Sequence, residues 1–359
     1  MTMNTPQTGA AAIPAWRATC IQVNSVPVSR APDKEAAWKL IDANVARAVR
    51  AVEAACDGPT PPRLVVLPEF PFTGPPHSLQ PAEWIELACD TLPGRSTQPL
   101  QELAARRRIF IAGNLFESDP RWPGRFFNSC FLINPQGALV LRYRRINTAL
   151  WPSPHDFLDA YMQEYGIEGL FPVVDTELGR LALVVCGEIS VPEVSRAFMM
   201  RGAEVLIHPT NEDDSPGQEA AKTARASENM AYVLSANVAG PIGFSLDGSV
   251  LGGRSRIVNF RGVTLSYEAG AQETNNVSAM IDIEALRAAR RDLGMANNLL
   301  RCRWEVYRPL FEKASFYPPN RFLNNPMAHS KETQAVSADA LAHLLSAGIA
   351  QPANATAII

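Results

Sequence analysis

The chain has 359 residues, of which 47% are hydrophobic and 19% are charged, and this composition is typical of a globular protein with a large core. Its 33 basic and 36 acidic residues leave a net charge of -3, so charge gives no reason to expect binding to nucleic acid or to an anionic membrane. No apolar run reaches the roughly 18 residues of a membrane-spanning helix, and the N-terminal segment lacks the charged-then-apolar order of a signal peptide. We therefore expect a cytoplasmic protein that acts on a small molecule or binds a protein partner.

Short β-branched runs alternate with helical patterns along the chain. The strand candidates are 18–23, 63–69, 109–117, 130–134, 139–145, 180–186, 204–209, 232–238, 255–260 and 277–283. Helical periodicity is clearest over 34–56, 99–108, 192–202 and 217–231. The alternation predicts an α/β layered fold in which helices cover sheets. Turn sequences at 134–137 and 259–262 each predict a hairpin, which suggests an internally duplicated sandwich.

The cysteines and histidines show no metal-ligand spacing. The six cysteines contain no CxxC pair and lie mostly in apolar runs, so we expect free thiols in a reducing compartment. The five histidines lack the i, i+4 pairing of a helical metal site. We predict neither a metal nor a cofactor.

Cys186 lies where an apolar strand ends, six residues before a helix that begins at about Pro192. Backbone N–H groups at such a turn can lower the pKa of a thiol and later stabilise an oxyanion. The alternative is a buried structural cysteine, although the strand end and the following Gly187 favour a nucleophile.

Glu69 is the second candidate, because it ends the apolar run 63–69. Burying an unpaired carboxylate is costly, so its position indicates either a structural salt bridge or a general base with a raised pKa.

A third group of candidates lies on the strand 139–145. Strand alternation places Arg142 and Arg144 on one face and Tyr143 and Arg145 on the other, and only one of these faces can point into a pocket. For basic strand residues a solvated face is the usual interpretation.

Taken in this order, the segments resemble the nitrilase superfamily of carbon–nitrogen hydrolases over about residues 16–290. The strongest stretch, 186–207, is similar to the cysteine motif of aliphatic amidases and formamidases. Downstream, 223–240 and 248–262 resemble the family's Arg-Ala-x-Glu-Asn helix and its closing strand pair. The resemblance implies a four-layer αββα sandwich and a Glu-Lys-Cys triad.

Carried over residue by residue, the resemblance makes Glu69 the base and Cys186 the nucleophile, and the lysine position falls on Arg145. A guanidinium can supply charge to an oxyanion together with the Gly187 N–H, but it does not deprotonate. Glu69 would then have to return the proton to the leaving group.

The family also implies a second carboxylate after the lysine position. Glu168 resembles it most closely and Glu164 is the alternative, on a segment at 152–172 that we interpret as a binding loop or lid. His208, near the end of the strand 204–209, and Asn211, just past it, lie where the family's pocket wall would be; either contacts substrate or caps the strand end. Arg225 and Glu228 should form an ion pair on one helix face.

The sequence thus predicts a hydrolase that cleaves a non-peptide carbon–nitrogen bond, of amide or carbamoyl type, through a cysteine thioester. Cys-x-Glu at 186–188 also resembles the nitrilases' Cys-Trp-Glu, so a nitrile hydrolase is one alternative. A non-catalytic member that binds a metabolite or partner is another, because of the arginine at the lysine position.

We divide the chain into a flexible tail at 1–15, a carbon–nitrogen hydrolase domain at 16–300 and a C-terminal extension at 301–359. About the last thirty residues have the composition of a tail rather than of core. The resemblance implies a homo-oligomer, and the extension is long enough to contact a neighbouring subunit.

Overall fold

Two six-stranded sheets stack face to face in the computed structural model, which describes residues 12–352 except 149, 244, 246–247 and 313–315. The first sheet contains β1 (Trp16–Gln22), β2 (Leu64–Val66), β3 (Phe110–Ser118), β4 (Phe126–Ile133), β5 (Leu139–Arg144) and β12 (Thr274–Ile281). The second contains β6 (Val174–Thr176), β7 (Gly179–Leu183), β8 (Val205–Thr210), β9 (Tyr232–Asn237), β10 (Arg256–Val258) and β11 (Thr264–Tyr267). The strand orders are β12-β1-β2-β3-β4-β5 and β11-β10-β9-β8-β7-β6.

The two sheets repeat one pattern of pairing. The strands β1, β2 and β3 run parallel, and β4 and β5 then continue the sheet antiparallel. In the second sheet β7, β8 and β9 run parallel, and β10 and β11 continue antiparallel. The two predicted hairpins, β4–β5 and β10–β11, are therefore confirmed, and they occupy equivalent places in the two halves.

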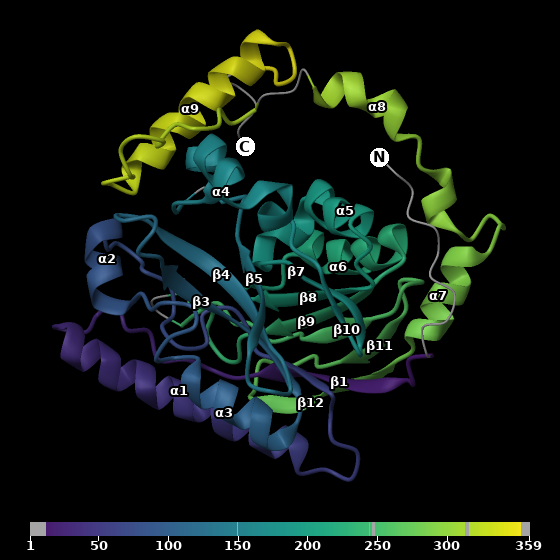
Figure 1. Cartoon of the computed structure of the whole chain (residues 1–359). Coiled ribbons are helices and arrows are strands. Elements are labelled where there is room, and N and C mark those ends of the chain that lie inside the picture. Colours follow the sequence, from purple (N-terminus) through teal and green to yellow (C-terminus); the bar gives the residue numbers. More distant parts are fainter. Residues whose placement is uncertain (1–11, 149, 244, 246–247, 313–315, 353–359) are drawn as a thin grey trace.

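Helices cover the outer face of each sheet. The helices are α1 (Lys34–Cys56), α2 (Pro81–Ala88), α3 (Gln98–Arg107), α4 (Leu158–Leu170), α5 (Pro192–Met200), α6 (Pro216–Asn229), α7 (Ile283–Arg291), α8 (Trp304–Phe311) and α9 (Lys331–Ser346). In Figure 1, α1 and α3 lie below the sheets, whereas α5 and α6 lie above them. The predicted four-layer αββα sandwich is confirmed.

Strand alternation explains how one sheet contributes to two cores. On β2, Leu64 and Val66 belong to the apolar core between the sheets, whereas Val65 packs in the core beneath α1. Helix α1 begins where the Asp33 carboxylate accepts a hydrogen bond from the Ala36 N–H at 2.8 Å. The same alternation decides which side chains after each strand end can face the space between the sheets.

Two segments differ from the sequence-based expectation. The segment 152–172, interpreted as a binding loop or lid, is largely helical: a 3₁₀ turn (Pro154–Phe157) leads directly into α4. Its aromatic side chains pack against Trp122 instead of facing a ligand, with Phe157 4.8 Å away between ring centroids. The C-terminal part that was expected to be a tail contains α9, on which Thr333 and Val336 are buried. Of the predicted tails, 1–11 and 353–359 lie outside the described residues.

The C-terminal extension packs on its own chain. The Asn320 N–H donates to the carbonyl of His155 at 3.0 Å, and the Phe322 N–H donates to the carbonyl of Asp156 at 2.9 Å. Arg125 donates to the carbonyl of Phe322 at 2.8 Å. These bonds fix the extension against the turn that precedes α4.

None of the helices in the described part of the chain is long and apolar enough to cross a bilayer.

Arg144 on β5 is fully buried, so a solvated face is the wrong interpretation for it. Its Nε donates to Glu117 at 3.0 Å, and its Nη2 donates to Glu117 and to Asp119 at 2.6 Å each. Arg142, on the same face, pairs with Glu117 at 3.1 Å. Two carboxylates thus compensate the buried guanidinium, which also lies 4.1 Å from the ring centre of Phe127.

We expect Arg144→Met to lower the free energy of unfolding by about 3–5 kcal/mol, because it leaves Glu117 and Asp119 without their buried counter-charge. Denaturation in guanidinium chloride measures this loss. The control is Arg180→Met, whose exposed pair with Asp175 at 2.7 Å should contribute less than about 1 kcal/mol. Equal losses in the two variants would contradict the expectation.

Candidate active site

Four strand ends converge at one edge of the sandwich. Glu69 follows β2 and Arg145 follows β5 in the first sheet, whereas Cys186 follows β7 and Asn211 follows β8 in the second. The Glu69 N–H donates across the sheets to the carbonyl of Thr210 at 3.2 Å. Of the predicted residues, the structure therefore brings Glu69, Arg145, Cys186 and Asn211 together.

Cys186 opens into a cavity of about 340 Å³. Polar and apolar groups both line it: Arg145, Thr148, Leu150, Trp151, Cys186, Gly187, Asn211, Glu212, Asp213, Gln218 and Ile242. A small polar molecule is the ligand that such a cavity fits.

Glu69 is fully buried and has one oxygen held and one free. Its Oε1 accepts hydrogen bonds from Asn128 Nδ2 at 2.8 Å and from Arg145 Nη1 at 3.5 Å, while Oε2 has no partner among the described residues. Asn128 is oriented in turn by Asn114, whose Nδ2 donates to Asn128 Oδ1 at 2.6 Å. Burial raises the pKa of Glu69 to about 7, against the lowering effects of Arg145, Asn128 and the neighbouring Cys186 thiol.

The Cys186 thiol is not a preformed thiolate. Burial and the neighbouring Glu69 carboxylate raise its pKa to about 12, although Arg145 acts in the opposite direction. Our expectation that the turn lowers the pKa of this thiol was wrong, because desolvation outweighs the nearby donors. The thiol therefore needs a base to take its proton, and Glu69 is the carboxylate beside it.

Cys186 also has an unusual backbone conformation, with φ at 45°. This left-handed conformation is costly for a residue with a side chain, so the surrounding contacts must stabilise it. His208 Nε2 lies 2.8 Å from the carbonyl oxygen of Cys186 and must donate to it, which leaves Nδ1 to accept from the Ser235 hydroxyl at 2.9 Å. Burial lowers the pKa of His208 to about 3, so the ring is neutral. His208 thus positions the cysteine through its backbone carbonyl and does not line the cavity at the thiol.

Arg225 on α6 stabilises the turn that follows the cysteine. Its Nε donates to the carbonyl of Ile189 at 2.9 Å, and its Nη2 donates to that of Ser190 at 3.4 Å. The predicted pair with Glu228 is confirmed at 2.8 Å. The ion pair therefore has a structural role at the base of the nucleophile turn.

Arg145 reaches over the same turn from the first sheet. Its Nε donates to the carbonyl of Asn147 at 3.0 Å. Its two terminal nitrogens then face the active site, with Nη1 near Glu69 and Nη2 near Gly187. A methyl group at Gly187 would lie only 3.3 Å from Arg145 Nη2, so a glycine here allows the guanidinium to approach the backbone next to the thiol.

Glu188 joins the two sheets beneath this guanidinium. It accepts hydrogen bonds from the Tyr143 hydroxyl at 2.9 Å and from the N–H groups of Ile146 and Asn147 at 3.0 and 2.7 Å. Sequence reasoning considered Glu188 only as part of a nitrilase-like Cys-x-Glu. In the structure it orients the segment that carries Arg145.

Glu168 and Glu164, the candidates for the second carboxylate, lie away from the cavity at Cys186. Both are exposed on α4, where Glu168 pairs with Arg201 at 3.2 Å and Glu164 with Arg121 at 3.1 Å. Neither lines the cavity, because the helix turns both side chains outward. The buried carboxylate that lines it is Glu212, which directly follows Asn211 and was not singled out in the sequence.

Asn211 contributes its amide group to the cavity. Its Oδ1 accepts from the Gly243 N–H at 2.9 Å, and its backbone carbonyl lies 3.8 Å from the Cys186 sulfur. Its buried Nδ2 has no hydrogen-bond partner in the part of the chain that the structure describes, so it is available to a ligand.

A second cavity of about 550 Å³ adjoins the first and shares Arg145, Thr148 and Gly187 with it. Its wall includes His155 together with Phe316 and Tyr317 of the C-terminal extension.

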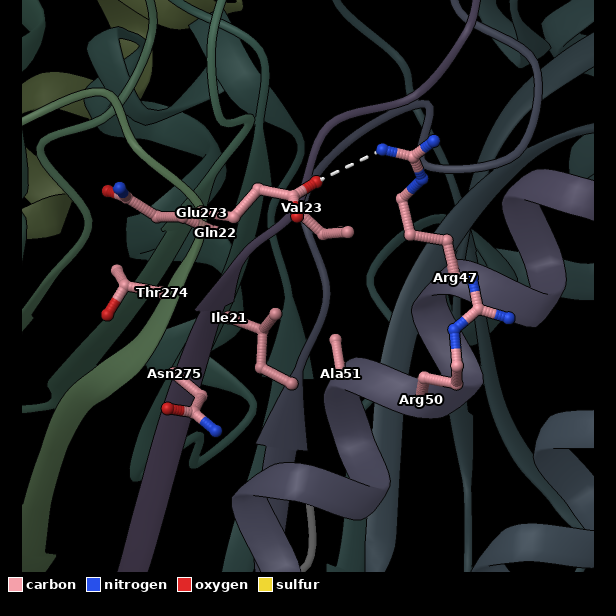
Figure 2. Close-up of a pocket in the computed structure, with 9 residues that line it drawn as sticks. All are labelled: Ile21, Gln22, Val23, Arg47, Arg50, Ala51, Glu273, Thr274 and Asn275. Atoms are coloured by element: carbon pink, nitrogen blue, oxygen red, sulfur yellow. Dashed lines mark hydrogen bonds and ion pairs between the residues drawn. The ribbon is translucent and has the colours of Figure 1, made fainter.

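A third hollow lies apart from the thiol, between the end of β1, helix α1 and the residues that lead into β12 (Figure 2). There Arg47 pairs with Glu273 at 3.4 Å, and none of the predicted site residues takes part.

Comparison with known proteins agrees with this geometry. Residues 17–291 match the model of the Carbon-nitrogen hydrolase family. The chain belongs to this family. As a carbon–nitrogen hydrolase it is an enzyme, and the interpretation as a non-catalytic binding protein is not supported.

Named relatives of this carbon–nitrogen hydrolase include two amidases. It is 33% identical over 251 residues to an (R)-stereoselective amidase of Pseudomonas sp. The aligned region covers 69% of this chain and 82% of the relative. It is 28% identical over 264 residues to a formamidase of Bacillus cereus strain B4264. Here the aligned region covers 72% of this chain and 74% of the relative.

Solved structures share the fold at lower identity. A carbon–nitrogen hydrolase from Helicobacter pylori G27 superposes with a TM-score of 0.60 at 21% identity, over 83% of this chain and 99% of that one. Nit3 of Saccharomyces cerevisiae, a nitrilase superfamily member, superposes with a TM-score of 0.59 at 23% identity, over 80% and 98%.

The alkylation rate of Cys186 by iodoacetamide should rise with pH through about 7, because Glu69 can accept the thiol proton only after losing its own. Peptide mass spectrometry at each pH follows the modification. In Glu69→Gln the rise near pH 7 should vanish, and reaction should need strongly alkaline solution. An unchanged profile in Glu69→Gln would contradict the contact between the two groups.

Proposed function

We propose that this carbon–nitrogen hydrolase cleaves a small carboxylic amide through a thioester on Cys186. The observation that carries the proposal is that the Glu69 carboxylate lies beside the Cys186 thiol and the Arg145 guanidinium, both of which line one cavity. The amidase names of the two relatives support an amide as the substrate class.

In the first half of the reaction, Glu69 takes the Cys186 proton and the sulfur attacks the carbonyl carbon. The oxyanion that forms is stabilised by the Arg145 guanidinium and the Gly187 N–H. As the carbon–nitrogen bond breaks, Glu69 returns its proton to the nitrogen, and ammonia or an amine leaves.

In the second half, Glu69 takes a proton from water, and the resulting hydroxide attacks the thioester. The carbon–sulfur bond breaks, the thiolate regains the proton from Glu69, and a carboxylic acid leaves. A base with a pKa of about 7 suits this exchange, because it can accept and release a proton near neutral pH. Since an arginine does not deprotonate, Glu69 is the group that carries the proton in both halves.

A nitrile substrate is the alternative within the same fold. The Glu188 carboxylate that completes Cys-x-Glu is occupied by four hydrogen-bond donors, two of them backbone groups, so it offers no specific support for nitrile chemistry. Measuring ammonia release from simple amides, carbamoyl compounds and nitriles separates the substrate classes.

We also propose a cytoplasmic homo-oligomer with a domain at 16–300 and an extension at 301–359. Six free cysteines, all within the described residues, support a reducing compartment. On α8, Val306, Leu310 and Phe311 are exposed by 64%, 70% and 55%, and an apolar face of this kind supports a subunit contact.

Incubation with a slowly hydrolysed amide should add the mass of its acyl group to the peptide that contains Cys186, as intact and peptide mass spectrometry measure. Cys186→Ala should abolish both the adduct and the turnover. The matched control is Cys302→Ala, which removes a partly exposed thiol and should leave activity unchanged. Full activity of Cys186→Ala would exclude the mechanism.

Arg145→Met should lower kcat by about 10²–10³-fold, because it removes a charged donor from the oxyanion. Arg145→Lys, which keeps the charge, should retain more activity than the methionine variant. Arg142→Met provides the control, since this neighbouring arginine lies on the other face of β5. Wild-type kcat in Arg145→Met would show that the oxyanion depends on other donors.

A further inference from the structure

The Glu212 carboxylate lines the cavity beside Cys186 and is held there by its own backbone. Its N–H donates to Asn237 Oδ1 at 3.1 Å, and its carbonyl accepts from Asn237 Nδ2 at 2.9 Å. Asn237 also donates to the carbonyl of Gly253 at 2.6 Å. Glu212 is therefore part of the rigid end of the second sheet, although it follows the last residue of β8.

Lys222 compensates the negative charge of Glu212 from behind. This lysine on α6 is fully buried, and its ammonium contacts the Oε1 of Glu212 and lies 2.6 Å from Glu219. Arg256 in turn pairs with Glu219. The ammonium supplies the counter-charge that a buried carboxylate needs, and the second carboxylate oxygen can accept a hydrogen bond from a ligand.

The unpaired polar atoms around the cavity are mostly acceptors. Among the described residues that line it, Glu212 Oε2 and Gln218 Oε1 are buried without a hydrogen-bond partner, against one such donor, Asn211 Nδ2. Buried acceptors without partners are costly, so a ligand that supplies N–H groups relieves this cost. The amide nitrogen of an unsubstituted amide supplies two such groups, whereas an ester supplies none.

Glu212 is also close enough to the reacting groups to influence them. Its charge acts on both Glu69 and Cys186, and it raises the pKa of each. The carboxylate thus lines the same cavity as the sulfur and lies near both reacting groups.

We propose that Glu212, anchored by Lys222, accepts a hydrogen bond from the nitrogen of the scissile amide and makes the enzyme selective for primary amides. This inference rests on the proposed amide hydrolysis. Glu212 transfers no proton; it orients the NH₂ group while Glu69 exchanges the proton with the sulfur and the leaving nitrogen.

The test compares one acyl group presented as a primary amide and as a methyl ester. In Glu212→Gln the kcat/KM for the amide should fall by about 10–100-fold, the effect of losing a hydrogen bond to a charged group, while the value for the ester stays within about threefold. Glu219→Gln is the matched control, because Glu219 contacts the same lysine without lining the cavity. It should leave the amide-to-ester ratio unchanged.

An equal loss on amide and ester would assign Glu212 a structural role only and overturn the proposal, as would unchanged kinetics on both. If Glu212→Gln does not fold, Glu212→Asp withdraws the acceptor by one methylene and should lower the amide-to-ester ratio in the same direction. The wild-type enzyme is assayed first: absence of an acyl adduct on Cys186 contradicts the proposed function itself. A normal adduct with an unaltered ratio in the variants overturns only the role of Glu212.

Discussion

A buried carboxyl group between the ends of two sheets is the constraint on which the rest of the site depends. Glu69 is removed from bulk solvent, so its charge depends on Asn128, Arg145 and the thiol. Asn128 needs Asn114 on the neighbouring strand to orient it. These contacts require β2, β3, β4 and β5 to be in register, and the packing of the first sheet therefore sets the proton affinity of the proposed base.

The second sheet has a different role, which is to stabilise a strained cysteine. The left-handed backbone at Cys186 is supported by His208 below it and by Arg225 behind the following turn. Glu188 connects this turn to the segment after β5. The proposed nucleophile and its cation thus come from different sheets, and small shifts between the sheets would change their separation.

The sequence predicted the central strands and the helices α1, α3, α5 and α6, because strand alternation and helical periodicity are local signals. It also predicted the positions of Glu69, Arg145 and Cys186, because they lie in or next to long motifs. It missed β6 and β11, which are short edge strands with little apolar pattern. The role of Glu188 was not recognised, because its partners Tyr143 and Asn147 lie 45 and 41 residues away in the sequence. The role of Glu212 was not recognised, because its partner Lys222 lies on another element, α6. Glu168 was chosen from its neighbours in sequence, but the helix at that position directs it to solvent.

The C-terminal extension has a consequence for the biosynthesis of the enzyme. The last strand of the sandwich is β12 and the helix after it ends at Arg291, whereas Phe316 and Tyr317 line the cavity that adjoins Arg145. During translation the sheets can assemble before these aromatic residues leave the ribosome. The cavity beside the guanidinium therefore gains its two aromatic wall residues only after the sandwich has formed.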